Sequence, residues 1–194
     1  MPVAQPRSPY RPRRLRLHDG REVTLRAIVE SDAPAIARAF DLLSPNSRYN
    51  RFLQHKKHLN PEALDRGVHP RPGRDFAFVA EVRNETGADI VGAAQYVRAT
   101  EDDTGLCEFA ITLAENWRGS GLATQLMRSL LRRARYDGYA VMEGLVLAGN
   151  EPMLALARKL GFSVEPEPPD GTVVRVLRRL QAVPPRKPAT GSGL

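Results

Sequence analysis

A strand, a glycine-rich turn and an amphipathic helix follow one another in the middle of this 194-residue chain. Residues 107–113 alternate with the period of a β-strand, and residues 118–123 read Arg-Gly-Ser-Gly-Leu-Ala. The next segment, about 121–136, is a predicted helix with one apolar face: Leu122, Ala123, Leu126, Met127, Leu130, Leu131 and Ala134. Glycines let the backbone approach a ligand closely, and the unpaired N–H groups of a helix N-terminus attract an anion. This order of elements predicts a phosphate or pyrophosphate site.

A second strand–helix unit follows the first. Residues 141–147 read as a strand, and the next helix is predicted to begin at Asn150 and to end at Gly161. Asn150 suits an N-cap, Pro152 suits a first helical turn and Gly161 suits the residue after the last turn. The pattern at 118–123 also arises by chance in a loop that opens a helix. The strand before it and the helices after it favour an anion site.

The two units together resemble the GNAT family of N-acetyltransferases. That family has Gln/Arg-x-x-Gly-x-Gly/Ala before its central helix, then a strand and an Asn-led helix that ends in Gly-Phe. Arg118–Ala123, Asn150 and Gly161-Phe162 occupy these positions here. The resemblance covers about residues 15–180 and looks most like the catalytic domain of bacterial Pat-type protein lysine acetyltransferases. This narrower resemblance rests on three sequence segments: Asp19–Arg26, Leu43–Tyr49 and Phe76–Ala80.

The resemblance implies an α/β (mixed α+β) fold with a central, mixed and mostly antiparallel sheet of about seven strands flanked by helices. The chain's own patterns predict the remaining strands at 14–18, 22–27, 75–83, 89–99, 163–167 and 172–180. They predict further helices after Ser31 or Asp32, at 45–53 and at 61–67, and in the family the last two cover the acceptor site. We expect one domain at 14–182, between disordered tails at 1–13 and 183–194.

Composition excludes several classes of function. The net charge of +7 comes from the chain ends, because segment 19–170 holds 19 basic and 22 acidic residues. This distribution indicates no nucleic-acid partner. No apolar run could span a membrane, and residues 1–14 lack the hydrophobic stretch of a secretory signal. The single cysteine, Cys107, fits a reducing cytoplasm, and the scattered histidines predict no metal site. We expect a cytoplasmic monomer or homodimer.

The resemblance implies transfer of an acetyl group from acetyl-CoA to a primary amine. That amine is protonated at neutral pH and must lose a proton before it can attack, which requires a base. Alternation places Glu108 with Ala110 and Thr112 on the strand face opposite Cys107 and Phe109. In Pat-like proteins a glutamate at this place is the general base. Glu108 is therefore the predicted catalytic residue, on the exposed face that the alternation gives it; the alternative is a salt bridge to an arginine.

The resemblance also implies where acetyl-CoA binds. The strands at 107–113 and 141–147 would splay apart around the pantetheine, with the pyrophosphate on the glycine-rich turn and Asn150 beside the pantetheine. The implied cofactor-binding residues are Ile111, Thr112, Leu113, Arg118, Gly119, Ser120, Gly121, Leu122, Ala123, Thr124 and Asn150. Many relatives have a tyrosine as general acid where this chain has Ala157. Either the thiolate leaves unassisted, or Tyr49 or Tyr139 helps it.

Three functions fit these observations. The first is an acetyl-CoA-dependent N-acetyltransferase that acts on protein lysine side chains. The second is an acetyltransferase for a small amine, such as a polyamine, an amino acid or an antibiotic. The third is an acyl-CoA-binding sensor without turnover. The sequence does not identify the acceptor.

Overall fold

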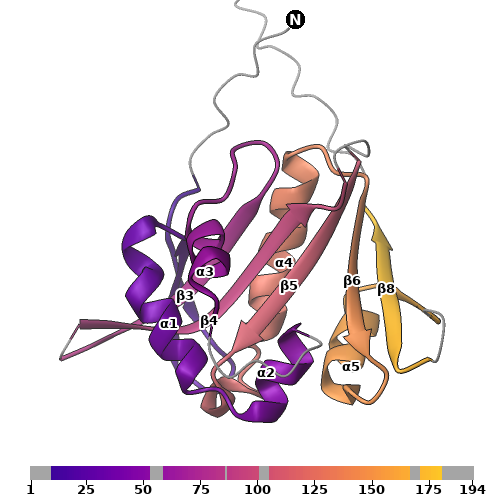
Figure 1. Cartoon of the computed structure of the whole chain (residues 1–194). Helices are drawn as coiled ribbons and strands as arrows, with labels where there is room; N and C mark the ends of the chain where they lie inside the picture. The colour runs from indigo at the N-terminus through magenta and orange to yellow at the C-terminus, as the bar shows by residue number, and fades with distance from the viewer. Residues whose placement is uncertain (1–9, 53–58, 86, 101–104, 167–170, 181–194) are drawn as a thin grey trace, which may run out of the picture.

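The computed structural model describes residues 10–52, 59–85, 87–100, 105–166 and 171–180. Within them a single sheet of eight strands has the order β1-β2-β3-β4-β5-β6-β8-β7 (Figure 1). The strands are β1 (Arg13–Arg16), β2 (Glu22–Ala27), β3 (Phe76–Asn84), β4 (Gly87–Arg98), β5 (Leu106–Leu113), β6 (Val141–Leu147), β7 (Ser163–Pro166) and β8 (Val173–Arg179). The helices are α1 (Ala33–Asp41), α2 (Pro45–Phe52), α3 (Pro61–Val68), α4 (Leu122–Tyr136) and α5 (Glu151–Lys159), with 3-10 turns η1 (Glu30–Asp32) and η2 (Glu115–Trp117).

Helices lie on both faces of the sheet (Figure 1). Helices α1, α2 and α3 lie in front of the central strands, and α4 lies behind them. The apolar face of α4 is fully buried in the same cluster as Phe78 of β3, Tyr96 of β4 and Phe109 of β5. As the alternation of β5 predicts, its apolar residues face this core and Glu108 faces away from it.

The two parallel strands, β5 and β6, pair over only three residues. Their register runs from Leu106 opposite Val141 to Glu108 opposite Glu143, and beyond that point they separate. Just beyond that point the ring of Phe109 packs over Gly144 of β6, where a Cβ atom would lie 2.6 Å from the ring. The splay implied by the family resemblance is thus present, and the packing of Phe109 against Gly144 lies where it begins.

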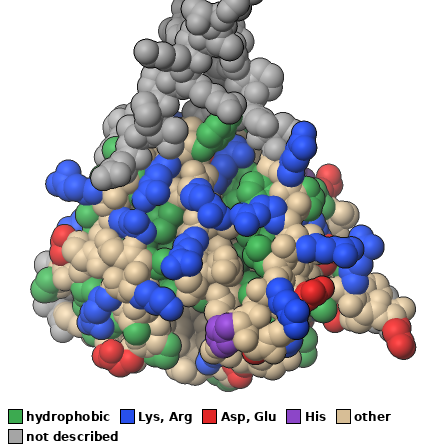
Figure 2. All heavy atoms as spheres, turned by 180° about the vertical axis from the view of Figure 1, so that it is seen from behind, with side chains coloured by type: hydrophobic (Ala, Val, Ile, Leu, Met, Phe, Trp, Pro, Cys, Tyr) green, Lys and Arg blue, Asp and Glu red, His purple; other side chains and the backbone are tan. Residues whose placement is uncertain are grey.

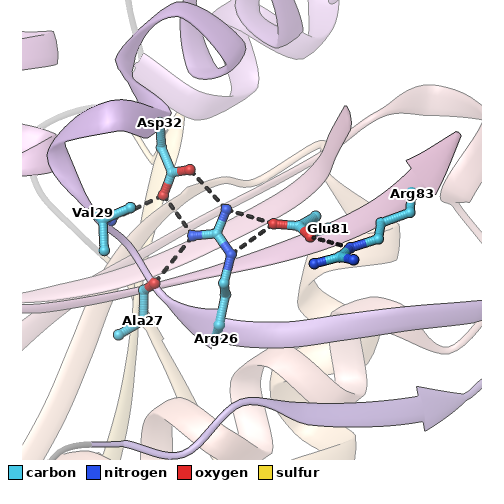
Figure 3. Close-up of polar contacts among 6 residues, drawn as sticks. All are labelled: Arg26, Ala27, Val29, Asp32, Glu81 and Arg83. Carbon is cyan, nitrogen blue, oxygen red and sulfur yellow. Dashed lines mark hydrogen bonds and ion pairs between the residues drawn. The ribbon is translucent and has the colours of Figure 1, made fainter. Parts of the chain in front are cut away.

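A cluster of charged side chains joins strands β2 and β3 to the start of helix α1 (Figure 3). The guanidinium of Arg26 on β2 donates two 2.7 Å hydrogen bonds to the carboxylate of Asp32 and one of 2.7 Å to Glu81 of β3. Burial alone would raise the pKa of Asp32, but hydrogen bonds from Arg26 and from the Val29 N–H outweigh it and hold that pKa below its usual value. The cluster fixes the start of α1 against the sheet. The sequence position of Asp32 suggested that its side chain caps α1. Its carboxylate binds Arg26 in this cluster instead and makes no capping hydrogen bond to the helix.

The observed sheet confirms the expected mixed and mostly antiparallel architecture, and its eight strands correspond to the eight segments that the sequence patterns predict. The edge strands β1 and β7 pair with β2 and β8. Tyr10 precedes the expected domain start at residue 14, and its ring packs edge-on against Phe78, with centroids 4.5 Å apart. The rest of the expected tails, 1–9 and 183–194, lies outside the described residues.

The face seen from behind Figure 1 carries many Lys and Arg side chains (Figure 2). Cations of α4, α5 and β8 line a hollow of about 270 Å³ there: Arg128, Arg132, Arg135, Lys159 and Arg178. Burial, and then the charge of Arg135, lower the pKa of Arg178. The net charge of segment 19–170 is slightly negative, so the sequence did not indicate this local excess of positive charge. None of the described helices is long and apolar enough to cross a membrane.

Candidate functional site

The glycine-rich turn before α4 is built to hold an anion. Gly119 and Gly121 adopt positive φ angles of 74° and 88°, which other residues rarely tolerate. The buried Ser120 hydroxyl donates to the Trp117 carbonyl at 2.7 Å and accepts from the Leu122 N–H at 3.3 Å, so it fixes the turn internally. Within the described part of the chain, the N–H groups of Ala123 and Thr124 have no hydrogen-bond partner. These groups and the helix dipole together attract a phosphate.

The turn offers a ligand mainly its backbone. The side chains of Ser120 and Leu122 are buried beneath it, and Leu122 is fully enclosed. Ser120 and Leu122, both predicted cofactor residues, can thus contribute only main-chain groups. Gly119 is exposed and Ala123 and Thr124 are half-buried, so this side of the turn is open.

The side chain of Arg118 binds the acceptor-side helix α2. Its guanidinium donates to the Ser47 hydroxyl at 2.6 Å, and the Ser47 hydroxyl donates to the Glu115 carboxylate at 2.7 Å. Glu115 also accepts from the Ser44 N–H at 3.0 Å. Hydrogen bonds from Ser44 and Ser47 lower the pKa of Glu115 to about 2. These contacts join segments that lie 71 residues apart in the chain. In the sequence, only the family resemblance of segment Leu43–Tyr49 could have indicated them.

The tip of the β1–β2 hairpin packs against the same turn. A Cβ atom on Gly121 would lie 3.0 Å from the His18 ring. Arg21 donates to the Asn116 carbonyl at 2.9 Å and lies 4.0 Å from the centroid of the Trp117 ring. A side chain at position 121 is therefore excluded by His18 as well as by the backbone angle. Sequence reasoning missed His18 and Arg21, since no local pattern brings a hairpin tip to this turn.

The gap between β5 and β6 leads from this turn to Glu108. The Ala114 N–H donates to the Val91 carbonyl, so alternation turns the N–H and C=O groups of Ile111 and Leu113 away from β4 and toward the gap. Thr112 lies in register with Ala93, so its backbone faces β4, unlike its two neighbours. Asn150 begins α5 at the far side of the gap, where its side-chain oxygen accepts from the Met153 N–H at 3.3 Å. Asn150 is thus the N-cap that its sequence position predicts.

Glu108 lies at the closed end of the gap. It is the last residue of β5 that pairs with β6, and Glu143 lies beside it in register. Its side chain is exposed, as the alternation of β5 predicts. Within the described residues Glu108 makes no ion pair or hydrogen bond, unlike Glu143, whose carboxylate lies 3.7 Å from Arg175. The salt-bridge alternative for Glu108 thus has no ion pair to support it among the described residues, although the charge of Arg51 interacts with that of Glu108.

A cavity of about 640 Å³ lies on the same side of the sheet as Glu108, under α1 and α3. Thr112 and Ala110 of β5 line it, together with Gln95 of β4 and Arg51 of α2. Burial lowers the pKa of Arg51 to about 10, and the charge of Glu108 opposes this shift. Ala110 and Thr112 share the β5 face of Glu108, which is the face opposite the core.

A sequence model described as "Acetyltransferase (GNAT) domain" matches residues 22–163. The chain belongs to the GNAT acetyltransferase family. Acetyltransferase PA5475 of Pseudomonas aeruginosa is 35% identical over 164 residues, which cover 84% of this chain and 86% of that one. The L-methionine sulfoximine/L-methionine sulfone acetyltransferase of Pseudomonas paraeruginosa is 32% identical over 90 residues, 45% of this chain and 52% of that one. The activity that accompanies this family is acetyl-CoA-dependent N-acetyl transfer, and similar solved structures include complexes with acetyl-CoA.

The GNAT domain of S. lividans PAT has the same fold. Its TM-score is 0.80 at 22% identity, with 87% of this chain and 97% of that chain covered. This confirms the predicted GNAT architecture. At 22% identity, this similarity shows the shared fold alone. The chemical class of the acceptor therefore has to be inferred from this chain's own residues.

One alternative for the general acid of this GNAT domain is removed by the structure. The Tyr139 hydroxyl is buried and donates to the Arg74 carbonyl at 2.7 Å, and burial raises its pKa. Ala157 is buried and has no group that could protonate a thiolate. Tyr49 lies half-buried on α2, on the acceptor side. Among the described residues, no three His, Cys, Asp or Glu side chains gather where they could hold a metal ion.

Proposed function

We propose that this GNAT domain acetylates a primary amine with Glu108 as the general base. The observation that carries the proposal is the position of Glu108 at the closed end of the β5–β6 gap, exposed on the cavity side and without an ion-pair partner in the described chain. Glu108 takes a proton from the ammonium, directly or through water. The amine nitrogen then attacks the thioester carbonyl and the C–N bond forms. The C–S bond breaks to release the CoA thiolate, and the nitrogen gives up its second proton to solvent.

The same proposal places acetyl-CoA along the gap. The pyrophosphate binds the N–H groups of the turn at Gly119–Thr124, and the pantetheine follows the free backbone edge of β5. The N–H of Ile111 or Leu113 polarises the thioester carbonyl as an oxyanion donor. Since Tyr139 is engaged elsewhere, we propose that the thiolate departs unassisted, which its pKa of about 8.5 allows.

Two acceptor classes have support of different kinds. Protein lysine is supported by the likeness of the fold to the GNAT domain of S. lividans PAT. A small amine is supported by the relative named L-methionine sulfoximine/L-methionine sulfone acetyltransferase and by the 640 Å³ cavity, a size typical of small-molecule sites. An exposed carboxylate at the end of the gap favours turnover over the sensor alternative.

Glu108→Gln tests the base directly. The amide keeps the shape of the side chain but accepts no proton, so kcat/KM should fall by about 10²–10⁴ and recover partly as rising pH deprotonates the amine. The affinity for acetyl-CoA, measured by calorimetry, should stay unchanged. The matched control is Glu143→Gln, which removes the neighbouring carboxylate that pairs with Arg175. Near-wild-type turnover by a well-folded Glu108→Gln enzyme would refute the assignment.

A further inference from the structure

The charged side chains that line the 640 Å³ cavity are nearly all basic: Arg51, Arg66, His69, Arg71 and Arg98. Asp75 is the one carboxylate among the described lining residues, and it already accepts from Arg71 at 2.7 Å. His69 lies 3.1 Å from the carboxylate of Asp65 and 3.6 Å from that of Glu30, so its charge is already paired. A cavity lined in this way repels a simple ammonium ion and attracts a carboxylate.

Apolar side chains also line the cavity. Ile28, Ile36 and Phe40 line it from the α1 side, Val68 from α3 and Ile90 from β4. Phe40, Val68 and Ile90 are buried, so this wall is part of the packed interior and offers a dry surface. A ligand that matches the whole cavity has an apolar group as well as an anionic one.

Arg51 is the cation best placed to act beside the reacting amine. It lies in the last turn of α2 and lines the cavity, and its charge interacts with that of Glu108. A half-buried guanidinium gains more from a carboxylate than an exposed one does, because less water competes for its donors. Arg51 has five N–H donors, so a contact elsewhere leaves room for a bidentate carboxylate.

We propose that the acceptor is a small α-amino acid with an apolar side chain. Its carboxylate binds Arg51, its amine lies at Glu108, and its side chain packs on the apolar wall. The inference rests on the proposed function and names the substrate class of that site. The ammonium loses one proton to Glu108, and its nitrogen attacks the acetyl carbon to form the C–N bond. The C–S bond breaks with its electron pair on CoA sulfur, and the second nitrogen proton passes through solvent to the CoA thiolate.

Matched substrate pairs test the proposal in the wild-type enzyme. Thiol release from acetyl-CoA is measured with L-leucine against 3-methylbutylamine, and with L-phenylalanine against 2-phenylethylamine. Each pair differs by the carboxylate alone. A charge-assisted hydrogen-bonded contact of this kind should give the amino acid an advantage in kcat/KM of about 10- to 100-fold. A lysine-containing peptide is the third acceptor.

Arg51→Gln then tests the residue. It should raise KM for the amino acid about 10- to 100-fold and change kcat/KM for the matched amine much less, so that the preference disappears. Turnover of the matched amine by the same variant shows that it is folded. Arg38→Gln is the control, because Arg38 is exposed on α1 and does not line the cavity.

The possible results separate this inference from the proposed function. Faster turnover of the decarboxylated amines or of the lysine peptide overturns the inference and leaves N-acetyl transfer standing. No thiol release with any amine, while acetyl-CoA still binds, overturns the proposed function and this inference with it. A carboxylate preference that survives Arg51→Gln overturns the role of Arg51.

Discussion

Replacing Gly144 with alanine should destabilise the fold at the point where β5 and β6 part. The new Cβ would lie 2.6, 2.9 and 3.0 Å from three atoms of the Phe109 ring. Carbon atoms in ordinary contact are about 3.5–4.0 Å apart, so the ring has to retreat by roughly 1 Å. The ring of Phe162 packs edge-on against it, with centroids 5.3 Å apart, and opposes that movement.

The expected size of the effect follows from this overlap. Overpacking of a core costs about 1–3 kcal/mol, and replacing a strand glycine returns about 0.5–1 kcal/mol. A net loss of about 1–2 kcal/mol corresponds to a fall in Tm of about 2–8 °C for a domain of this size. The ring would also press on β5 where acetyl-CoA is proposed to lie. The stabilisation by acetyl-CoA, about 2.7 kcal/mol at a hundred times Kd, should therefore shrink.

Thermal denaturation with and without acetyl-CoA measures both effects. The control is Gly149→Ala, since a Cβ at Gly149 meets nothing within 4 Å and the residue has no positive φ. Combining Gly144→Ala with Phe109→Leu should cost less than the sum of the two single changes, because the smaller side chain makes room. If Gly144→Ala melts at or above the wild-type temperature, the account of the splay given above is wrong.

Three further changes test other parts of the structure. Asp32→Asn should cost about 2–3 kcal/mol, less than a fully buried pair because Arg26 keeps its bond to Glu81. Since the pKa of Asp32 is lowered on folding, this deficit in urea denaturation should be complete above the unfolded value of about 3.9 and vanish as pH falls through the folded pKa. Ser47→Ala should weaken acetyl-CoA binding in calorimetry several-fold, because Arg118 loses its 2.6 Å partner; unchanged affinity would contradict a link between α2 and the turn. A chain that begins at residue 14 should melt a few degrees below one that begins at Tyr10, and equal melting would show that the Tyr10 contact contributes nothing.

The sequence predicted the local geometry of the candidate site because its strongest signals are local. Positive φ at Gly119 and Gly121, the N-cap at Asn150 and the two faces of β5 each depend on a few neighbouring residues. Such features follow from steric limits and from the periods of helix and strand. The fold class and the direction of Glu108 could therefore be inferred before any tertiary contact was known.

Tertiary structure alone decided what surrounds these elements. The register that ends at Glu108 and Glu143, the Phe109 ring over Gly144 and the bond from Arg118 to Ser47 join segments far apart in the chain. No window of sequence encodes such contacts, because they depend on how whole layers pack. The distribution of charge also depends on packing. The net charge of segment 19–170 is slightly negative, yet arginines gather around the 640 Å³ cavity in the folded chain. The sequence by itself determined the local chemistry of the cofactor turn, and only packing determined which acceptor its neighbouring cavity can attract.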